Sequence, residues 1–559
     1  MYLDIHIPIP DLPGVITRLR IKGTTYINYE YDRIYDKVRR YNIPKRATIG
    51  KLADDGLMIP NENYHKYFPG INLPGETSRS IRSSCLRIGS YILINKLLTG
   101  YRLPELLGHY FSSRDVGLFL DLAVYSLVSE NNAAQYYPDY AWNHPLFTDR
   151  MKIYSDSKVS SFLNSITDEQ SIGFLNRWNQ NREHGERIYI TYDSTNKNSQ
   201  AGDLSMVEYG KAKNDLSLPV FNYSIAYDLK HREPLFYEEY PGSIVDVSQL
   251  QFMLGKARGY GYKNVGFILD RGYFSKENIR FLDESGYSFI LMMKGMSRLA
   301  AEHILAYRGS FECRRACEIR EYKAYGITIK AKLYAEDPHE RYFHIFHGTG
   351  REHAEREMVE IKMERMARYL KKNEGEKISC SDVLKHYYEL FFEKDKFLFA
   401  KEKSEVVERE LSLCGYFCII TSEQMTAREA LTLYKSRDDS EKLFRGDKSY
   451  LGNRSMRVYS DESTSAKIFI EFVALIIRNK IYTSLKSAVL KNERKANYMT
   501  VPAALHELEK IEMIKSNDGI YRLDHAVTAT QKEILRAFGL DENFVKAKAA
   551  ELSAELQQL

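Results

Sequence analysis

The sequence predicts an α/β fold built on a mixed sheet with flanking helices. Three observations predict it: apolar runs of strand length recur between residues 187 and 295, helical segments separate the later runs, and a similar run returns only after residue 413. Apolar periodicity is the main signal of secondary structure in a single sequence. At 559 residues the chain exceeds the roughly 250 to 300 residues that one hydrophobic core can fill, so we expect several domains.

Two regions precede this sheet. Residues 1–75 mix short extended pieces with cations and tyrosines, which alternate between Tyr31 and Arg46. Aromatic rings interleaved with positive charge suit a nucleic-acid backbone, and a solvated strand face explains the same pattern. We therefore expect a small mixed β region for DNA binding or dimerisation. Residues 76–184 repeat apolar side chains at helical spacing and are predicted to be a helical region.

Residues 185–295 are predicted to form the first part of the main core. Three strands come first, and then helix, strand, helix and strand alternate. They are, in chain order, residues 187–193, 218–228, 233–242, 246–261, 264–270, 275–286 and 287–295. A strand meander that continues into alternating helices and strands is the order of a ribonuclease H-like mixed sheet.

The core resumes after an interruption. Residues 296–412 mix strand-like pieces with a charged helix, and we interpret them as an inserted β-rich subdomain. An apolar strand at 415–422 and the helical segments after it form the second part of the core, residues 413–485. Residues 486–559 begin with cations and continue with helical periodicity, so they are predicted to form a helical C-terminal region.

The composition excludes several classes of protein. Lys and Arg number 80 against 75 Asp and Glu, and the resulting net charge of +5 rules out a histone-like basic protein. The six cysteines lack the CxxC spacing of a structural zinc site. No pair among His184, His231 and His303 has the spacing of a zinc site on one helix face, so we assign these histidines to structure.

We expect a soluble, cytoplasmic protein with no membrane partner. The most apolar run, Ile468–Ile477, contains Glu471 and is far shorter than the roughly 20 residues that span a bilayer. The N-terminus lacks a basic start followed by an apolar stretch, so no signal peptide is expected.

Two aspartates end predicted strands of the core. Asp193 closes the first apolar strand and Asp270 closes a later one, which puts both at the carboxyl edge of an open sheet, where ligands bind. Mg²⁺ prefers oxygen ligands and is usually held by one or two carboxylates together with phosphate oxygens. The pair could therefore form part of a site for phosphoryl transfer, although an Asp at a strand end is also a common turn residue.

A third carboxylate follows in the segment YKSRDDSEKLFRGDK. At about 100° per residue, Tyr434, Arg437, Glu441 and Lys448 fall within an arc of roughly 60° if the helix is continuous. Such a face offers a carboxylate for a metal ion and two cations for flanking phosphates. A solvated, charged helix surface is the alternative explanation.

The spacing Tyr, two residues, Arg, three residues, Glu, six residues, Lys resembles the signature of DDE transposases in the bacterial superfamily founded on insertion sequence four. TYDST at 191–195 is similar to that family's first-Asp strand, and ILDRGYFSKENIRFL at 268–282 is similar to its second-Asp segment. The resemblance covers about residues 185–480. Shorter pieces at both ends look like the longer-chain branch of the superfamily.

The resemblance implies a ribonuclease H-like catalytic core in which Asp193, Asp270 and Glu441 hold two divalent ions, Mg²⁺ or Mn²⁺. It further implies cleavage of double-stranded DNA at transposon inverted-repeat ends and joining to target DNA, by a homodimer that brings two ends together. The expected DNA contacts are Tyr434, Arg437 and Lys448, with Arg271, Lys276 and Lys294 as plausible additional phosphate contacts at the sheet edge.

Two other functions fit the same residues. The first is a ribonuclease H-like nuclease that cuts DNA without strand transfer, and the second is a non-catalytic DNA-binding remnant of a mobile element. The sequence also departs from some relatives that hold a flipped base on a tryptophan of the insertion, because Trp142 and Trp178 both precede Asp193. The sequence therefore leaves open whether a hairpin intermediate forms.

Overall fold

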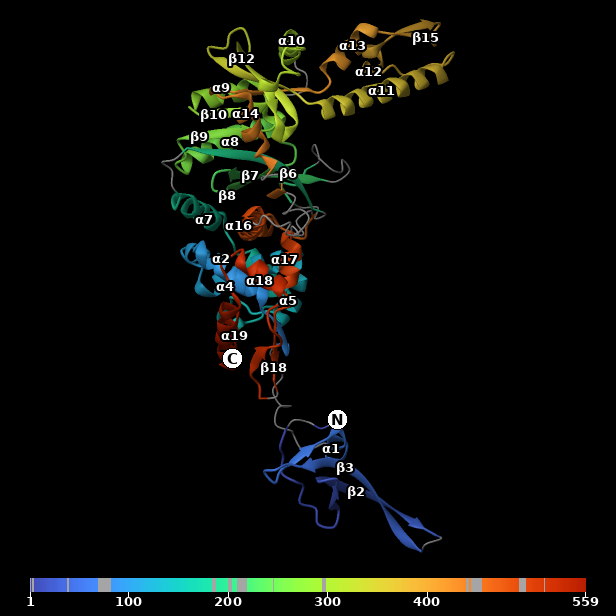
Figure 1. The fold of residues 1–559 in the computed structure, drawn as a ribbon, viewed down its shortest axis with the longest axis vertical. Coiled ribbons are helices and arrows are strands. Elements are labelled where there is room, and N and C mark those ends of the chain that lie inside the picture. The colour runs from blue at the N-terminus through green and yellow to red at the C-terminus, as the bar shows by residue number, and fades with distance from the viewer. Residues whose placement is uncertain are drawn as a thin grey trace. The chain divides into compact units, whose positions relative to one another are not determined.

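The computed structural model describes all residues except 1, 3–4, 38–39, 69–81, 183–186, 200–203, 209–218, 245, 294–297, 439–441, 444–454, 492–498, 517 and 559. The chain forms two compact units (Figure 1). The first comprises residues 1–97, 135–155 and 487–559, and the second comprises residues 98–134 and 156–486. Among the described residues, no helix is both long and apolar enough to cross a membrane.

A large mixed sheet forms the centre of the second unit. In spatial order its strands are β11 (Glu318–Ile319), β12 (Ala324–Lys332), β13 (Glu340–His347), β16 (Tyr416–Thr421), β10 (Ser288–Met292), β9 (Val265–Leu269), β6 (Ile188–Ser199), β7 (Val220–Asp228) and β8 (Glu233–Pro241), and β17 (Ser455–Met456) pairs with β6. Strands β6, β7 and β8 form an antiparallel meander, and β9 and β10 extend it in parallel. This arrangement confirms the predicted α/β fold with a ribonuclease H-like strand order.

Helices connect these strands and cover them. Helix α8 (Asp246–Gly259) leads from β8 to β9, and α9 (Lys276–Glu284) leads from β9 to β10. Helix α14 (Ala427–Lys435) packs on β10, β12, β13 and β16 through a core that includes Ile268, Ile290 and Leu431. Its first turn is fixed by a reciprocal capping box between Thr426 and Glu429.

The long helix α16 (Asp461–Lys491) links the sheet to the helices before it. Phe472 packs on Tyr237 of β8 at 5.1 Å between ring centroids, whereas Phe469 packs on Phe119 at 4.8 Å and on Phe174 at 5.2 Å. These two phenylalanines of the helical region lie in α4 (Ser113–Ser129) and α7 (Asp168–Gln180), and α3 (Leu103–Gly108) and α6 (Asp156–Leu163) complete this layer. Its apolar run is therefore buried within the protein on two sides.

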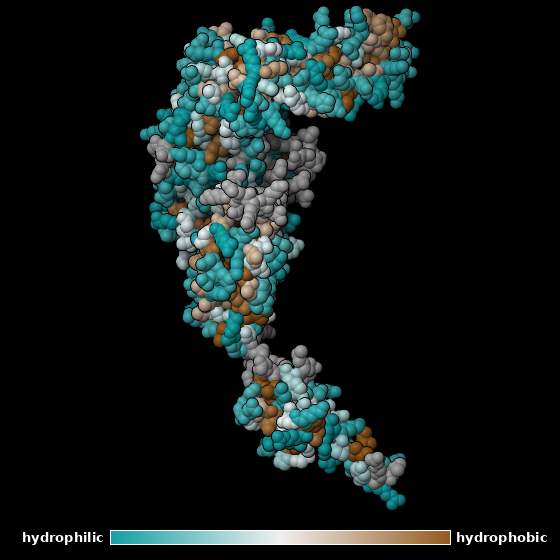
Figure 2. Space-filling model, viewed as in Figure 1, coloured by the Kyte–Doolittle hydropathy of each residue, from teal (hydrophilic) through white to brown (hydrophobic). Residues whose placement is uncertain are grey.

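The predicted insertion, residues 296–412, has two parts: its first strands extend the main sheet, and its later residues have a separate hydrophobic core. After α10 (Arg298–Tyr307), its strands β11, β12 and β13 continue the main sheet, because β13 pairs antiparallel with β16. Residues 349–413 form a separate body with a core of their own, which includes Met363, Tyr387 and Phe397. The elements of this body are α11 (Thr349–Lys372), α12 (Asp382–Tyr387), β14 (Tyr388–Glu393), β15 (Lys396–Glu402) and α13 (Ser404–Leu413). Figure 2 shows hydrophobic residues gathered over the β14–β15 hairpin.

The first unit begins with a four-stranded antiparallel sheet, β1 (Ile16–Ile21), β2 (Thr24–Asp36), β3 (Tyr41–Leu52) and β4 (Met58–Pro60), followed by α1 (Glu62–Tyr67). Ile27, Ile49 and Met58 are fully buried at its centre. These residues come from β2, β3 and β4 and give the sheet one covered face.

The remainder of the first unit is not wholly helical, contrary to expectation. Its helices include α2 (Gly89–Gly100, which runs into the second unit), α5 (Tyr137–Asn143), α17 (Val501–Leu508), α18 (Ala529–Arg536) and α19 (Glu542–Gln557). In addition, β5 (Cys85–Arg87), β18 (Glu512–Lys515) and β19 (Tyr521–Leu523) form a three-stranded sheet. Strands of three or four residues are too short to show a periodicity of their own, which explains why the pattern missed them.

Candidate active site

Asp193 and Asp270 occupy corresponding positions along the neighbouring parallel strands β6 and β9. Asp270 directly follows β9, as predicted, but Asp193 does not close its strand, because β6 continues to Ser199 and its polar residues go on pairing with β7. In the β6–β9 pair, Thr191 lies opposite Ile268 and Tyr192 lies opposite Leu269. Asp193 follows Tyr192, and Asp270 follows Leu269, so the two aspartates come next at the same level of the sheet. Residues opposite each other point to the same face of a sheet, and every second residue of a strand returns to it. The two carboxylates therefore share one face of the sheet, and a joint site formed by them stays a prediction.

The strand residues that precede the two aspartates are buried. Ile190, Tyr192, Ile268 and Leu269 have no solvent exposure. Consecutive residues such as Ile268 and Leu269 point to opposite faces, so both faces of this strand pair are covered next to the two aspartates. The Ser194 N–H donates to Oδ1 of the half-buried Asp193 at 2.9 Å.

Asp270 meets two of the predicted DNA-contact residues. Arg437 Nη1 lies 3.2 Å from its Oδ1, and the Tyr434 hydroxyl donates to the same oxygen at 3.4 Å. The Arg437 guanidinium lies 5.5 Å from the centre of the Tyr434 ring, and only 13% of the Arg437 side chain is exposed. Residues more than 160 positions apart in the chain thus form one cluster.

The described residues interrupt the predicted continuous helix between Tyr434 and Arg437. Helix α14 ends at Lys435, and Ser436 is its C-cap. The Arg437 N–H donates to the Tyr434 carbonyl at 3.2 Å, three residues back, which tightens the chain at this point. Tyr434 and Arg437 therefore meet at Asp270 through the turn that ends the helix, rather than along a shared helix stripe.

Three predicted site residues, Lys294, Glu441 and Lys448, lie outside the described residues. The described part of the chain contains no group of three or more His, Cys, Asp or Glu side chains that could hold a metal ion, and Glu441 is the third carboxylate of the predicted set. Arg271 begins a single turn (Arg271–Tyr273) directly after Asp270, and its N–H donates to Asp270 Oδ1 at 2.7 Å. Lys276 is the first residue of α9, and its side chain is exposed.

The donor set fits a divalent cation. Carboxylate oxygens on adjacent strands are ligands that Mg²⁺ and Mn²⁺ prefer. The Arg271 N–H, the Tyr434 hydroxyl and the Arg437 guanidinium all lie against Oδ1 of Asp270 and orient this carboxylate.

A buried ion pair, which sequence patterns did not identify, supports the strand that carries Asp193. Lys197 and Glu471 are 0% and 2% exposed in their side chains, and Lys197 Nζ lies 2.9 Å from Glu471 Oε2. Lys197 is two pleats beyond Asp193 on the same face of β6, and its Nζ lies 4.3 Å from the centre of the Tyr223 ring. The available signal was Glu471 within the most apolar run of the chain.

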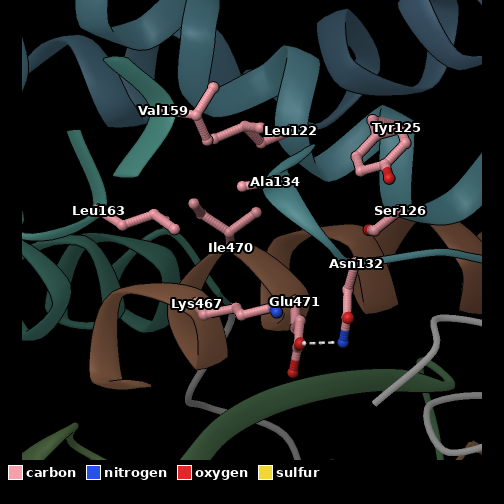
Figure 3. Close-up of a pocket in the computed structure, with 10 residues that line it drawn as sticks. All are labelled: Leu122, Tyr125, Ser126, Asn132, Ala134, Val159, Leu163, Lys467, Ile470 and Glu471. Carbon is pink, nitrogen blue, oxygen red and sulfur yellow. Dashed lines mark hydrogen bonds between the residues drawn. The ribbon is translucent and has the colours of Figure 1, made fainter. Parts of the chain in front are cut away.

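Figure 3 shows how Glu471 is surrounded. Asn132 donates to its Oε1 at 3.4 Å, and Lys467, one turn earlier on α16, borders the same cavity of about 30 Å³. Burial lowers the pKa of Lys467 to about 8, an effect that Glu471 opposes and Lys197 reinforces. One carboxylate thus serves two buried amines.

Comparison with known proteins identifies the family. Residues 193–477 match the transposase DDE domain family, and this match begins at Asp193. The chain belongs to this family. The predicted assignment of the transposase to the branch founded on insertion sequence four stays a prediction.

No curated protein matches the chain. Among solved structures, the transposase is similar to the cryo-EM structure of a piggyBac transposase synaptic complex with hairpin DNA, at 8% sequence identity and a TM-score of 0.38. That similarity covers 79% of this chain and 75% of the other.

Proposed function

We propose that this transposase binds the terminal inverted repeats of an insertion sequence and catalyses metal-dependent DNA cleavage and strand transfer. The observation that carries the proposal is the correspondence of Asp193, within β6, and Asp270, directly after the parallel strand β9, with Arg437 and Tyr434 against Asp270. Membership of the DDE family supports the reaction class.

Asp193, Asp270 and Glu441 are assigned as the metal ligands. Two bound Mg²⁺ or Mn²⁺ ions would activate a water, and then a DNA 3′-hydroxyl, for in-line attack and would stabilise the leaving oxygen. Arg437 carries two roles in this proposal. Its guanidinium orients the Asp270 carboxylate, and its remaining N–H groups can hold a phosphate oxygen beside the scissile bond.

The other cations are assigned to the flanking DNA. Arg271 and Lys276 are exposed and follow Asp270 closely in the chain, so phosphates of a strand that enters the site would pass within reach of both. Lys294 and Lys448 complete the proposed set of phosphate contacts, and Tyr434 is proposed to contact the DNA end. Two transposon ends have to be joined in one complex, so the active form is proposed to be a homodimer that works in the cytoplasm.

A strand-transfer assay tests the proposal. The substrate is a duplex that carries the terminal sequence flanking the gene, with a supercoiled plasmid as target and either Mg²⁺ or a chelator present. We expect cleavage and joining with Mg²⁺ and neither with the chelator. Cutting without joining would support a nuclease instead, and DNA binding alone would support a non-catalytic remnant.

Substitutions locate the chemistry. Asp193→Asn, Asp270→Asn and Glu441→Gln should each abolish cleavage and joining while DNA binding is retained, because they remove a metal ligand without a large change in shape. Glu284→Gln is the matched control, since Glu284 is an exposed carboxylate at the far end of α9. Cleavage by any of the three site variants would contradict the assignment of that residue.

A further inference from the structure

The hairpin of β2 and β3 extends beyond the sheet that anchors it. Strand β1 pairs with β2 only over Thr24–Tyr29, and β4 pairs with β3 only over Gly50–Leu52. Beyond these residues the two strands continue as a ribbon with five paired positions, from Asp32 opposite Lys45 to Asp36 opposite Tyr41. Five pairs at about 3.4 Å per residue give a two-stranded ribbon of about 17 Å.

The ribbon exposes aromatic and apolar side chains, which in most sheets are buried against neighbouring residues. Tyr35 is 56% exposed, Tyr41 51% and Ile34 48%. At the base of the same strands, Ile27 and Ile49 are fully buried, so the exposed positions belong to the ribbon and not to an incomplete core. Figure 2 shows hydrophobic residues along this ribbon among hydrophilic ones.

Positive charge is concentrated on the same segment. Residues 31–46 contain six Lys and Arg and two Asp, a net charge of +4, whereas the whole chain of 559 residues has a net charge of only +5. One of the two aspartates, Asp32, lies 3.5 Å from Lys45 across the ribbon. A polyanion is therefore the partner that complements this surface.

Two arginines at the base of the ribbon are held in position by one buried carboxylate. Arg33 Nε donates to Glu30 Oε1 at 2.5 Å, and Arg46 Nε donates to Glu30 Oε2 at 3.1 Å. The Glu30 side chain is only 5% exposed, whereas those of Arg33 and Arg46 are 63% and 46% exposed. The hydrogen bond from Arg33 lowers the pKa of Glu30, so the carboxylate stays ionised and the guanidinium groups stay oriented with N–H groups toward solvent.

We propose that the β2–β3 ribbon enters the major groove of double-stranded DNA, with Arg33 and Arg46 on the phosphates that border the groove and Tyr35 against the bases. The major groove is about 12 Å wide and admits a two-stranded ribbon. The inference rests on the proposed function, because it assigns to this ribbon part of the binding of the DNA ends.

Anisotropy titrations of a labelled duplex from the DNA flanking the gene test this inference, with the full chain in an Asp193→Asn background that cannot cut. The test variant is Glu30→Gln/Arg33→Gln/Arg46→Gln, which removes both cations together with the buried anion and so leaves no buried charge unpaired. The matched control is Arg18→Gln/Arg20→Gln, which removes two exposed cations from β1 of the same sheet. Two lost phosphate contacts should lower the slope of log affinity against log salt by about 1.8, and the control should leave it unchanged.

Tyr35→Ala provides a second test. It does not change the net charge, and because Tyr35 is exposed it should not impair folding. It should weaken binding without a change in the salt slope, because a base contact releases no counterions. Methylation of guanine N7 reports on the major groove, and the protection that the wild-type ribbon confers should disappear in this variant.

Unchanged affinity and an unchanged salt slope in the triple variant would overturn the inference, and so would unchanged guanine protection with Tyr35→Ala. A third contrary result would be a triple variant that binds DNA normally but has lost the mass of a dimer in solution. The last result would make the ribbon an interface between two copies of the chain. A parent protein that binds no duplex DNA would contradict the proposed function itself, whereas binding that all variants share would contradict only the role of the ribbon.

Discussion

The buried ion pair between β6 and α16 predicts an unequal response to substitution. Glu471 interacts with two buried amines, those of Lys197 and Lys467. Glu471→Leu would remove this carboxylate from both amines in a water-poor environment. Lys197→Met would instead leave Glu471 beside Lys467, which can take over as its partner. We therefore expect Glu471→Leu to be the more destabilising change.

Loss of one partner of a buried pair costs about 3 to 5 kcal/mol in free energy of unfolding, and Glu471→Leu should reach or exceed the upper end of that range. Lys197→Met should stay at or below its lower end. The double variant Lys197→Met/Glu471→Leu should lie near wild type, because apolar side chains of similar volume replace both charges. Lys467 then loses the attraction of Glu471 and the repulsion of Lys197 together.

Urea unfolding followed by tryptophan fluorescence measures these differences. Trp142 belongs to the first unit and Trp178 to the second, so a Trp142→Phe background makes the signal report on the unit that contains the ion pair. Trp178 suits this purpose because it is 4% exposed and its Nε1 donates to the Pro234 carbonyl at 3.0 Å. Equal costs for the two single variants, or a double variant as unstable as their sum, would refute the reasoning.

Three further outcomes follow from the same structure. Arg437→Ala should slow DNA cleavage about 100-fold in single-turnover kinetics. Arg437→Lys should recover part of the rate, because lysine restores the charge but not the planar guanidinium group. Full activity in Arg437→Ala would exclude a role of Arg437 in cleavage. The pKa of Lys467 is about 8 in the folded protein against an ordinary value of 10.5, so between these values only the unfolded chain holds the proton. The free energy of unfolding, relative to that of Lys467→Met, should therefore rise with pH across this window by on the order of 3 kcal/mol in total. A difference in urea unfolding free energy that is flat or falls from about pH 7.5 to pH 9.5 would contradict this. Gly415→Ala should destabilise by more than about 1 kcal/mol, because φ is +87° and its Cβ would lie 2.6 Å from that of Glu352. Gly375→Ala, at φ +83° with no atom within 4 Å, should cost less in the same measurement.

The sequence was sufficient to predict the central strands and the strand end at Asp270, but it placed the end of the first strand at Asp193, whereas β6 continues to Ser199. Buried parallel strands are continuous apolar runs, and such runs end sharply at Asp193 and Asp270. The residues also predicted that Tyr434 and Arg437 belong with this site. They did not predict the manner of contact, because the end of α14 at Lys435 depends on turn geometry rather than on periodicity.

Long-range pairing could not be predicted from local patterns. Strand β5 near residue 86 pairs with β18 near residue 513, and β12 and β13 join the far side of β16 instead of forming a sheet of their own. Hydrophobic alternation reports that a strand has a buried face, but it carries no information on which strand lies beside it. The same limit applies to Lys197 and Glu471, which are each unremarkable until β6 and α16 meet.

The pairing of β13 with β16 has a consequence for how the gene can change. Gly348 and Gly415 face each other across the ends of these strands, and the Gly348 N–H donates to the Gly415 carbonyl at 3.0 Å. The residues between Gly348 and Gly415 therefore connect the antiparallel strands β13 and β16 in the same way as the loop of a β-hairpin. Closing a loop of that length instead of a four-residue turn costs only about 2.5 kcal/mol, because the entropy grows with the logarithm of length. A change in the length of residues 349–413 therefore carries a small entropic cost for the sheet that holds Asp193 and Asp270 in register.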